Sequence, residues 1–299
     1  MNKGYIAGLL VLAGASSAFA ADMPVKARVA AVPYVQYNDI LAANNQIMVQ
    51  AVGTHLNYAE YDDGRSYPPG TFVDSEKGWV PGIGLKVSAM GDWAVSNLYV
   101  AAEASWSKGH TSYFEPPGVL GGPVSLTHNA QIADAAFRLG KGFGITPNFM
   151  ITPFAEFGFH QWQRDTSPMN GETYEHEYAG GGLLFQYAPV QRLVLSASGM
   201  VGTTIDPKIS IAANPRINTA VDLGLGSELT WRVGGAVDYA ITPHFHVSGS
   251  LDYTEFKYGA SARDPINGIY EPNSTSQVLV GKIGFGYSWG GGDAVVAKY

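Results

Sequence analysis

Cysteine is absent from the 299-residue chain, which excludes disulfide bonds and thiolate chemistry. Charged residues are scarce at 14%, well below the roughly 25% of soluble domains. After the first twenty residues, the chain also lacks an uninterrupted apolar run of roughly 18 residues, so no membrane-spanning helix is expected. Acids outnumber bases, and the resulting net charge of −7 argues against nucleic acid as a partner.

Glycine, aromatic residues and alternation are what the chain has in quantity. The 37 Gly and 17 Pro beside 12% aromatic residues are typical of many strands joined by turns. From residue 47 onward, apolar and polar side chains alternate with period two; in one segment Trp79, Ile83 and Leu85 share a face and Lys86 lies on the other. Alternation predicts about ten strands, at 47–61, 79–89, 98–107, 133–139, 149–163, 174–187, 192–200, 228–239, 245–258 and 279–287.

The first twenty residues have the layout of a secretory signal peptide. Lys3 supplies a positive charge, a short apolar run covers 6–12, and an Ala-x-Ala sequence ends at Ala20. We therefore expect cleavage between Ala20 and Ala21, with an uncleaved anchor as the alternative. The predicted organisation is a signal peptide at 1–20, an irregular periplasmic lead at 21–46, a β-barrel at 47–289 and a tail at 290–299.

Mid-strand charges fall on the small, polar face of the predicted strands. A Lys or Arg that faces lipid at the bilayer midplane costs about 2–4 kcal/mol, so a membrane-spanning barrel requires this segregation. A soluble barrel would instead place the apolar face inside, and alternation alone does not distinguish the two. We predict that the polar face lines the barrel interior, with a charge network of Lys86, Glu103, Asp134, Arg138, Glu156, Glu228, Arg232, Asp238, Asp252 and Lys282.

The lengths of the connections favour the membrane barrel. Bacterial outer-membrane barrels alternate short periplasmic turns with longer extracellular loops, and an even strand number places both termini in the periplasm. Ten strands fit this pattern, whereas eight, the alternative, would turn two hairpins into loops. Short connections are predicted at 90–97, 142–148, 188–191 and 240–244, and long ones at 62–78, 109–127, 164–173, 201–224 and 259–274.

Aromatic side chains sort to two levels along the predicted strands. Amphipathic rings collect where a barrel meets the two membrane interfaces, so two girdles are expected. The predicted members are Tyr58, Trp79, Trp106, Tyr178 and Tyr253 near the long loops, and Tyr187, Tyr239, Phe245, Tyr287 and Trp289 near the short turns.

The predicted barrel is too narrow for a wide pore. Side chains just fill a barrel of eight strands, whereas open porins have about 16–18 strands. Unpaired charges in a filled interior would be costly, so a structural network is preferred to a narrow or gated conduit. The three glycines at 180–182 are interpreted as a bend or a close approach by large neighbours, rather than a hinge.

The last predicted strand resembles the β-signal of outer-membrane proteins. Lys282, Gly284, Tyr287 and Trp289 match its polar, glycine and aromatic positions. The resemblance implies recognition by the barrel-assembly machinery. The tail at 290–299 departs from the usual arrangement, in which the signal ends the chain, so Trp289 and Tyr299 both remain candidates for the terminal aromatic residue.

Three further segments resemble outer-membrane β-barrel proteins. The predicted mature start, 21–27, is similar to that of many alphaproteobacterial outer-membrane proteins. Segments 74–82 and 153–164 look like parts of the broad opacity-type β-barrel family. The resemblance implies a closed antiparallel up-and-down transmembrane barrel, all β, in the outer membrane, and it implies no chemistry.

An enzyme is the main alternative, because the omptin outer-membrane proteases also have ten strands. Those proteases activate water with Asp and His groups at the extracellular rim. No Asp-x-His pair of their kind occurs here, and rim acids and histidines are usually solvated loop residues. The candidates would be Asp62, Asp63, His110, His160, Glu175, His176 and Glu177.

Two shorter motifs are weaker candidates for chemistry. His246 and Ser248 echo the His-x-Ser of lipid A deacylases, but they would lie in the interior near a periplasmic turn. Glu175, His176 and Glu177 could ligate a metal, but alternation sends His176 to the opposite face from both acids.

The sequence therefore predicts a non-enzymatic integral outer-membrane barrel with a structural or surface-interaction role. No cofactor, metal or catalytic residue is expected. The expected partners are outer-membrane lipid, lipopolysaccharide and the barrel-assembly machinery. A narrow channel and an omptin-like hydrolase are the alternatives, and the oligomeric state is left open.

Overall fold

The computed structural model describes residues 38–165, 171–213, 217 and 219–289. The predicted signal peptide with its cleavage point at Ala20 and Ala21, most of the lead, and the tail lie outside these residues. Within them the chain forms one helix, α1 (Asp39–Asn44), and twelve strands. The strands are β1 (Gln46–Tyr61), β2 (Phe72–Gly91), β3 (Leu98–Glu115), β4 (Val124–Lys141), β5 (Phe143–Thr146), β6 (Phe149–Arg164), β7 (Glu172–Val190), β8 (Leu193–Ile211), β9 (Val221–Gly224), β10 (Leu229–Ala240), β11 (Phe245–Tyr258) and β12 (Asn273–Ser288).

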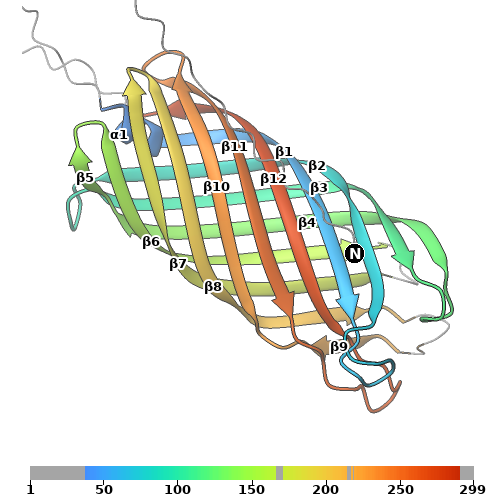
Figure 1. The fold of residues 1–299 in the computed structure, drawn as a ribbon. Helices are drawn as coiled ribbons and strands as arrows, with labels where there is room; N and C mark the ends of the chain where they lie inside the picture. The colour runs from blue at the N-terminus through green and yellow to red at the C-terminus, as the bar shows by residue number, and fades with distance from the viewer. Residues whose placement is uncertain (1–37, 166–170, 214–216, 218, 290–299) are drawn as a thin grey trace, which may run out of the picture. The chain divides into compact units, whose positions relative to one another are not determined.

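Ten of these strands pair into a closed antiparallel barrel (Figure 1). Neighbours around the barrel follow the chain from β1 to β12, and β12 pairs back with β1. The two short strands lie outside this ring, where β5 pairs with β6 and β9 pairs with β8. The ring itself continues from β8 directly to β10. Closure leaves no unpaired edge, as a sheet in lipid requires. The prediction of ten strands is confirmed, and the alternative of eight is wrong.

Several strands extend further toward the long loops than the sequence predicted. Strand β2 begins at Phe72 rather than Trp79, and β8 continues to Ile211 rather than ending near Met200. The alternation persists in these extensions, because Asp74 and Glu76 are both buried on the inward face of β2. The charged residues in these extensions mark where the outer face becomes polar, and strand pairing continues past that level.

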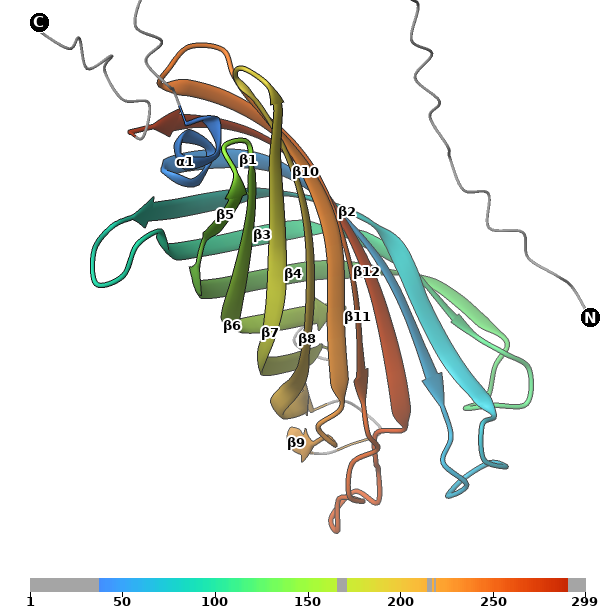
Figure 2. The same ribbon diagram turned by 60° about the vertical axis from the view of Figure 1, so that its left-hand side comes forward.

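The end of the predicted lead is not irregular. Residues 39–44 form α1 at the short-turn end of the barrel (Figure 2). The Asn38 side chain caps the helix by accepting a hydrogen bond from Leu41 N at 3.1 Å. Ile40 and Ala43 are buried, and the helix packs against β2, β7 and β8. A helix this short has no measurable period, so the sequence pattern did not reveal it.

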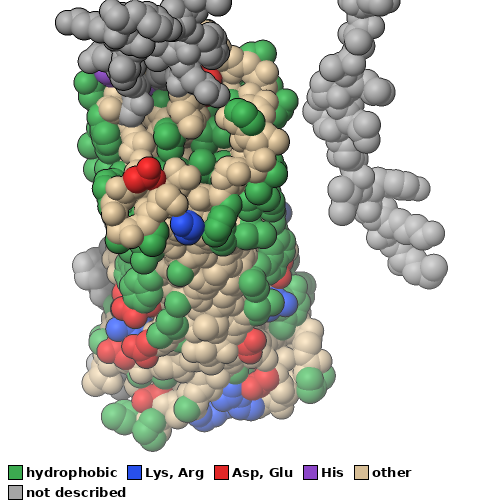
Figure 3. Space-filling view, turned by 90° about the vertical axis from the view of Figure 1, so that its left-hand side faces the viewer, with side chains coloured by type: hydrophobic (Ala, Val, Ile, Leu, Met, Phe, Trp, Pro, Cys, Tyr) green, Lys and Arg blue, Asp and Glu red, His purple; other side chains and the backbone are tan. Residues whose placement is uncertain are grey.

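The outer face of the barrel is apolar between the short turns and a level marked by tryptophan. Ile283 is 70% exposed and Phe285 56%, both on the outward face of β12. Beyond Trp79 and Trp106 the outward residues become polar, as with Lys108 on β3. Figure 3 shows the same segregation on one face, where most red and blue side chains gather in the lower part. An apolar outside around a polar inside is the arrangement of a membrane-spanning barrel.

No helix among the described residues is long and apolar enough to cross a membrane.

The aromatic girdles are only partly as predicted. Trp79 and Trp106 lie exposed on the outer face, as do Tyr187, Tyr239, Phe245, Tyr287 and Trp289 near the short turns. Tyr253 is half-exposed and contacts Trp231. Tyr58 and Tyr178 face the interior instead, where Tyr58 is fully buried. The girdle prediction depended on how far along its strand each ring lies, and it did not use the face on which the ring lies. On β1, Tyr58 alternates in step with Leu56, and both side chains are buried.

Interior rings pack over glycines of neighbouring strands. A Cβ at Gly158 on β6 would come within 2.3 Å of the Tyr178 ring, and one at Gly182 within 2.5 Å of Phe154. Only glycine admits such an approach without displacing the ring. Close approach by large neighbours is thus found at Gly182, one of the three consecutive glycines.

Replacing Ile283 by Arg should destabilise the barrel in a bilayer by about 2–4 kcal/mol, because this side chain lies mid-belt on the outer face of β12. Gln277→Arg on the same face, beyond the apolar belt, should cost only about 0–1 kcal/mol. Urea unfolding in lipid vesicles measures both. Equal losses at the two positions would contradict the assigned belt.

Candidate functional site: the charged barrel interior

The interior is best followed along the inward face of β6. Glu156, His160 and Arg164 all point inward from this strand and are spaced four residues apart, roughly 13 Å between neighbours. Each is the centre of a separate cluster. From the short turns toward the long loops we call these the ion-pair layer, the histidine layer and the Arg164 cluster.

Helix α1 is hydrogen-bonded into the short-turn end of the barrel. Its last residue, Asn44, donates to Gln186 Oε1 on β7 at 2.7 Å. Gln46 donates to Asp238 on β10 at 3.2 Å, and Asp238 Oδ1 lies 2.5 Å from His246 Nδ1 on β11. Buried polar contacts therefore tie the helix and the first residue of β1 to β7 and β10.

The ion-pair layer joins neighbouring strands and also links β6 to β10, which are not neighbours. Glu156 accepts from Arg138 Nε at 2.5 Å, from Arg232 across the barrel on β10, and from Tyr178 at 2.9 Å. Glu156 is 3% exposed, so its charge depends on these partners for compensation.

A second group in the same layer is centred on Lys282 of β12. Its Nζ lies 2.5 Å from Glu103 on β3 and 3.3 Å from Asp252 on β11. Lys86 on β2 faces the same space. The two groups together place four basic and three acidic side chains at one level, which leaves the layer close to charge balance.

Two interior cavities, each of about 90 Å³, meet at this layer. The cavity on the short-turn side is lined by Asn44, Gln46 and Asp238, and the other by His160 and Phe256. Both are bounded by the same five charged side chains, Lys86, Glu103, Arg138, Asp252 and Lys282. The ion-pair layer therefore lies between two small cavities.

The histidine layer lies above the second cavity. His160 Nδ1 lies 2.7 Å from Asp134 Oδ1, and His176 Nδ1 lies 2.6 Å from the Tyr258 hydroxyl. The two imidazole rings come from the neighbouring strands β6 and β7, and their centroids lie 5.3 Å apart. The Phe256 ring packs against both.

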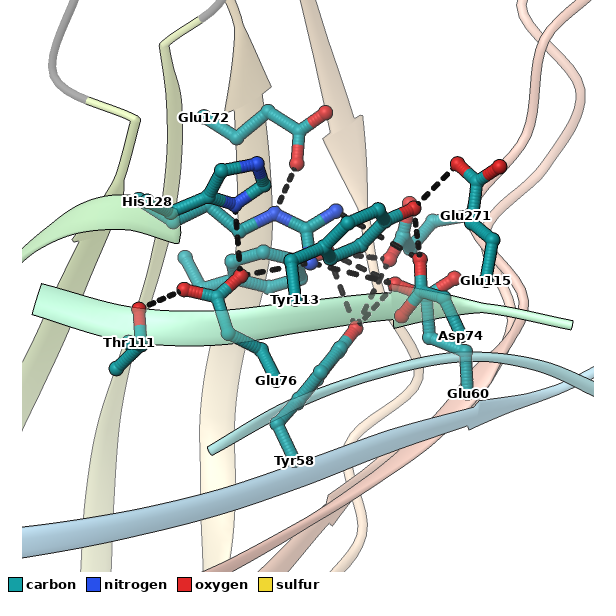
Figure 4. A network of polar contacts seen from close by, with 12 residues as sticks. Tyr58, Glu60, Asp74, Glu76, Thr111, Tyr113, Glu115, His128, Glu172 and Glu271 are labelled. Carbon is teal, nitrogen blue, oxygen red and sulfur yellow. Dashed lines mark hydrogen bonds and ion pairs between the residues drawn. The ribbon is translucent and has the colours of Figure 1, made fainter. Parts of the chain in front are cut away.

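The Arg164 cluster fills the long-loop end and holds an excess of acid (Figure 4). Arg164 Nε lies 2.5 Å from Glu172, while other guanidinium nitrogens lie 3.8–3.9 Å from Glu60, Asp74 and Glu76. Four rings surround its Cζ at 5.6–5.7 Å, those of Tyr58, Tyr113, Trp162 and Tyr174. One guanidinium thus serves several buried carboxylates.

Tyrosine hydroxyls and other neutral donors share those carboxylates. Tyr58 donates to Glu60 at 2.7 Å, and Tyr174 donates to Glu271 at 2.6 Å. Tyr113 donates to Glu115 at 2.6 Å. Thr111 and His128 both contact Glu76.

Glu271 belongs to the loop between β11 and β12 and is 7% exposed. Burial raises the pKa of Glu271 to about 7, and the nearby charge of Glu172 acts in the same direction. The arrangement favours a shared proton over full ionisation of the cluster at neutral pH.

The structure places nine of the ten predicted interior charges on the inward face, in the clusters above. Glu228 is the exception. It precedes β10 and is exposed, and the hydrogen bonds found for it among the described residues join its backbone to Thr203 and Thr204. Glu228 alternates in step with Arg232, which predicts the inward face. The pairing of β10 begins only at Leu229, so Glu228 is not held on that face. The predicted single network is also several separate clusters.

The candidate catalytic residues do not gather at one rim. His160 and His176 meet inside the barrel. His110 and Glu177 are exposed on the outer face, and Glu175 pairs there with Lys208 at 2.8 Å. Asp63 pairs with Arg65 in the loop after β1.

Asp62, in the same loop, is hydrogen-bonded to its own loop and to a second one. It accepts hydrogen bonds from Gly64 N and the Tyr270 hydroxyl. Burial acts to raise its pKa, but these hydrogen bonds prevail, so the pKa lies below the ordinary value. The contacts tie the loop after β1 to the loop before β12.

Alternation separates His176 from the acids beside it and keeps His246 and Ser248 on one inward face, as predicted. His176 is buried while Glu177 is exposed. His246 pairs with Asp238, whereas Ser248 contacts Met48. Among the described residues, no group of three or more His, Asp or Glu side chains is placed to hold a metal ion.

The residues of the β-signal pattern occupy the end of β12. Lys282 and Gly284 point inward, while Tyr287 and Trp289 are exposed outside. Trp289 lies one residue past the strand, where its N–H donates to Asn45 O.

The Arg164 cluster is what the sequence interpretation missed. Its members fall in segments that were assigned to loops, 62–78, 109–127, 164–173 and 259–274, or at strand ends beside them. A signal was present, because Glu156, His160 and Arg164 keep one parity, as do Asp74 and Glu76. Following parity beyond the apolar belt would have found them.

Comparisons with known proteins identify the fold. No family model and no curated protein sequence matches the chain. The structure is similar to the outer membrane protease OmpT from Escherichia coli, with a TM-score of 0.52 and 9% identity over 82% of this chain and 97% of that one. OprG from Pseudomonas aeruginosa and Ail from Yersinia pestis are more distant, at TM-scores of 0.35 and 0.28, each with 10% identity over 82% of this chain and 98% of theirs. The fold is that of outer-membrane β-barrels.

Replacing Glu156 by Gln should destabilise the barrel by about 3–5 kcal/mol, because Arg138 and Arg232 would lose their shared carboxylate. Unfolding free energy measured by urea titration tests this. Glu177→Gln, on the exposed face, should change stability by no more than about 0.5 kcal/mol. A small effect at Glu156 would show that the pair is not stabilising.

The raised pKa of Glu271 predicts a pH-dependent stability. Between its ordinary value of 4.5 and about 7, the folded chain binds more protons at this site than the unfolded chain. Stability should therefore fall as pH rises through this window, by up to about 3 kcal/mol from this group, and level off above it. Unfolding at pH 5 and pH 8 should show a smaller difference in Glu271→Gln and an unchanged one in Glu228→Gln.

Proposed function

We propose that this chain is an integral outer-membrane barrel whose interior is closed and whose long-loop end serves surface interaction. The observation that carries the proposal is the filled interior. α1, the ion-pair layer and the Arg164 cluster follow one another along the barrel, and each links strands that are not neighbours. Such an interior stabilises a scaffold, and it leaves the loops as the variable, accessible part.

The outer-membrane location is supported by the outer surface and by the fold. Large apolar side chains are exposed all round the barrel, on strands from β1 through β12. That surface would be unstable in water and is stable in lipid. The fold is shared with outer-membrane barrels, and the sequence has the layout expected of an exported chain.

Contacts that hold the long loops in place support a role in recognition. Arg65 from the loop after β1 donates to Ser261 O in the loop before β12, at 2.8 Å. Arg65 and Arg263 both lie against the Tyr270 ring, at 4.1 and 4.7 Å. Loops held in this way lose less conformational entropy on binding a partner.

A narrow channel is the second candidate, because the two cavities adjoin the ion-pair layer. Conduction would require that layer to open, which breaks charged contacts in a low-dielectric interior. We also propose that the chain is not an enzyme. The described Asp and His candidates are divided among the interior, the outer face and the loops, so no shared site is formed by them.

In planar bilayers the purified wild-type barrel should show no discrete conductance, because the ion-pair layer separates the two cavities. The double variant Glu156→Ala, Arg232→Ala should show transient openings, since it removes the link from β6 to β10. Glu177→Ala on the outer face is the matched control and should remain silent. Stable unitary steps from the wild type would overturn the closed-interior proposal in favour of a channel.

A further inference from the structure

The outer face of β1–β3 carries a group of basic and aromatic side chains where the apolar belt ends. We call Lys77, Lys108, His55 and His110 with Trp79 the basic patch. Trp79 pairs with His55 in the sheet register, and their rings lie 5.1 Å apart. Lys77, Lys108, His110 and Trp79 are exposed, and His55 is half-exposed.

Acidic side chains are absent from this part of the outer surface. On the fully described strands β1–β4, every Asp and Glu belongs to the inward face or a strand end turned inward, as Glu60, Glu76 and Glu103 show. Asp63, which is paired with Arg65, and Asp92 are exposed in the connections before and after β2. The outward acids of the strands themselves lie on the other side of the barrel, from β7 to β11. They include Glu175, Glu177, Asp206, Asp222 and Glu255.

An apolar groove lies in the apolar belt, on the side of the basic patch that faces the short turns. Its volume is about 330 Å³, and it crosses β2, β3, β4 and β6 on the outer face. Small side chains, Ala104 and Ala135, pair with each other between the larger Leu85 and Phe159. The groove is a gap in the apolar belt that a flexible hydrocarbon chain could fill.

The groove and the basic patch are continuous along β3. Ala104, Trp106 and Lys108 follow one another on the outward face, with roughly 6.6 Å between successive Cα atoms. Trp106 is exposed at the boundary, the level where tryptophan meets lipid headgroups. An amphipathic molecule could therefore place an anionic head at Lys108 and a tail in the groove.

We propose that this face binds an outer-leaflet lipid with a phosphorylated headgroup, its phosphate at Lys77 and Lys108 and one acyl chain in the groove. Lysine is a point-charge partner for phosphate, and the absence of nearby acid leaves the positive potential uncompensated. Phosphate without a hydrocarbon tail would leave the groove empty, so the lipid is the occupant. The inference rests on the proposed membrane location, because only there does the groove face lipid.

The test compares lipid A that carries both phosphates with dephosphorylated lipid A, each added to the purified full-length barrel. Native mass spectrometry measures the bound fraction over a titration. Lys77→Gln combined with Lys108→Gln should weaken binding of phosphorylated lipid A by about 30-fold, since each Lys near an anionic lipid contributes about fivefold. Lys257→Gln, an exposed lysine on β11 next to Glu255, is the control and should change it by less than about twofold.

A second variant tests the groove. Ala104→Leu and Ala135→Leu together should fill it and weaken lipid binding with both lysines intact. Unchanged affinity in the double-lysine variant, or an equal loss in Lys257→Gln, would overturn the proposal. Displacement by inorganic phosphate as effective as by lipid A would also overturn it, because the site would then be an anion site alone.

Heat-modifiable migration on gels establishes that each variant is folded before binding is measured. A folded barrel that is silent in bilayers and binds no phosphorylated lipid A would reject this inference and leave the proposed function standing. A barrel that fails to insert into lipid would reject the proposed function itself.

Discussion

Glu156 lies between two guanidinium groups in the middle of a barrel too narrow to hold much water, and that contact constrains the rest of the interior. Arg138 and Arg232 come from β4 and β10, while Glu156 comes from β6, so one carboxylate couples separate parts of the wall. Lys282 does the same for β3, β11 and β12. Because any one of these charges alone would be costly to bury, the strands that supply them must keep their register.

Charge balance changes along the barrel axis. The ion-pair layer has nearly equal numbers of acids and bases. Around Arg164 the acids predominate, and tyrosine hydroxyls supply the hydrogen bonds that further cations would otherwise provide. Stability at the long-loop end therefore depends on protonation, through Glu271, whereas the middle depends on ion pairing.

Fold and strand number could be predicted because the constraint of lipid acts on every residue of the outer face. The same constraint placed Lys86, Arg138 and Lys282 inside. Beyond the apolar belt, water solvates both loops and strands, so outer-face hydropathy no longer marks where pairing ends. For that reason the sequence did not predict that Asp74, Glu76 and Arg164 lie on strands. Tyr58 was predicted on the outer face because an aromatic ring is stable both at a membrane interface and in a protein interior. α1 depends on tertiary contacts such as Asn44 with Gln186, which no local pattern encodes.

Strand β3 reaches the lipid boundary near Trp106 and continues paired to Glu115. Nine residues at about 3.3 Å each, tilted by about 40°, raise the strand end roughly 20 Å above the headgroups. The paired strands therefore form a stiff extension of the barrel that carries the loops. The perimeter of this extension is set by the spacing of hydrogen-bonded strands. A partner approaching from outside meets a rim held clear of the lipid surface, at a height that thermal motion of the loops does not alter.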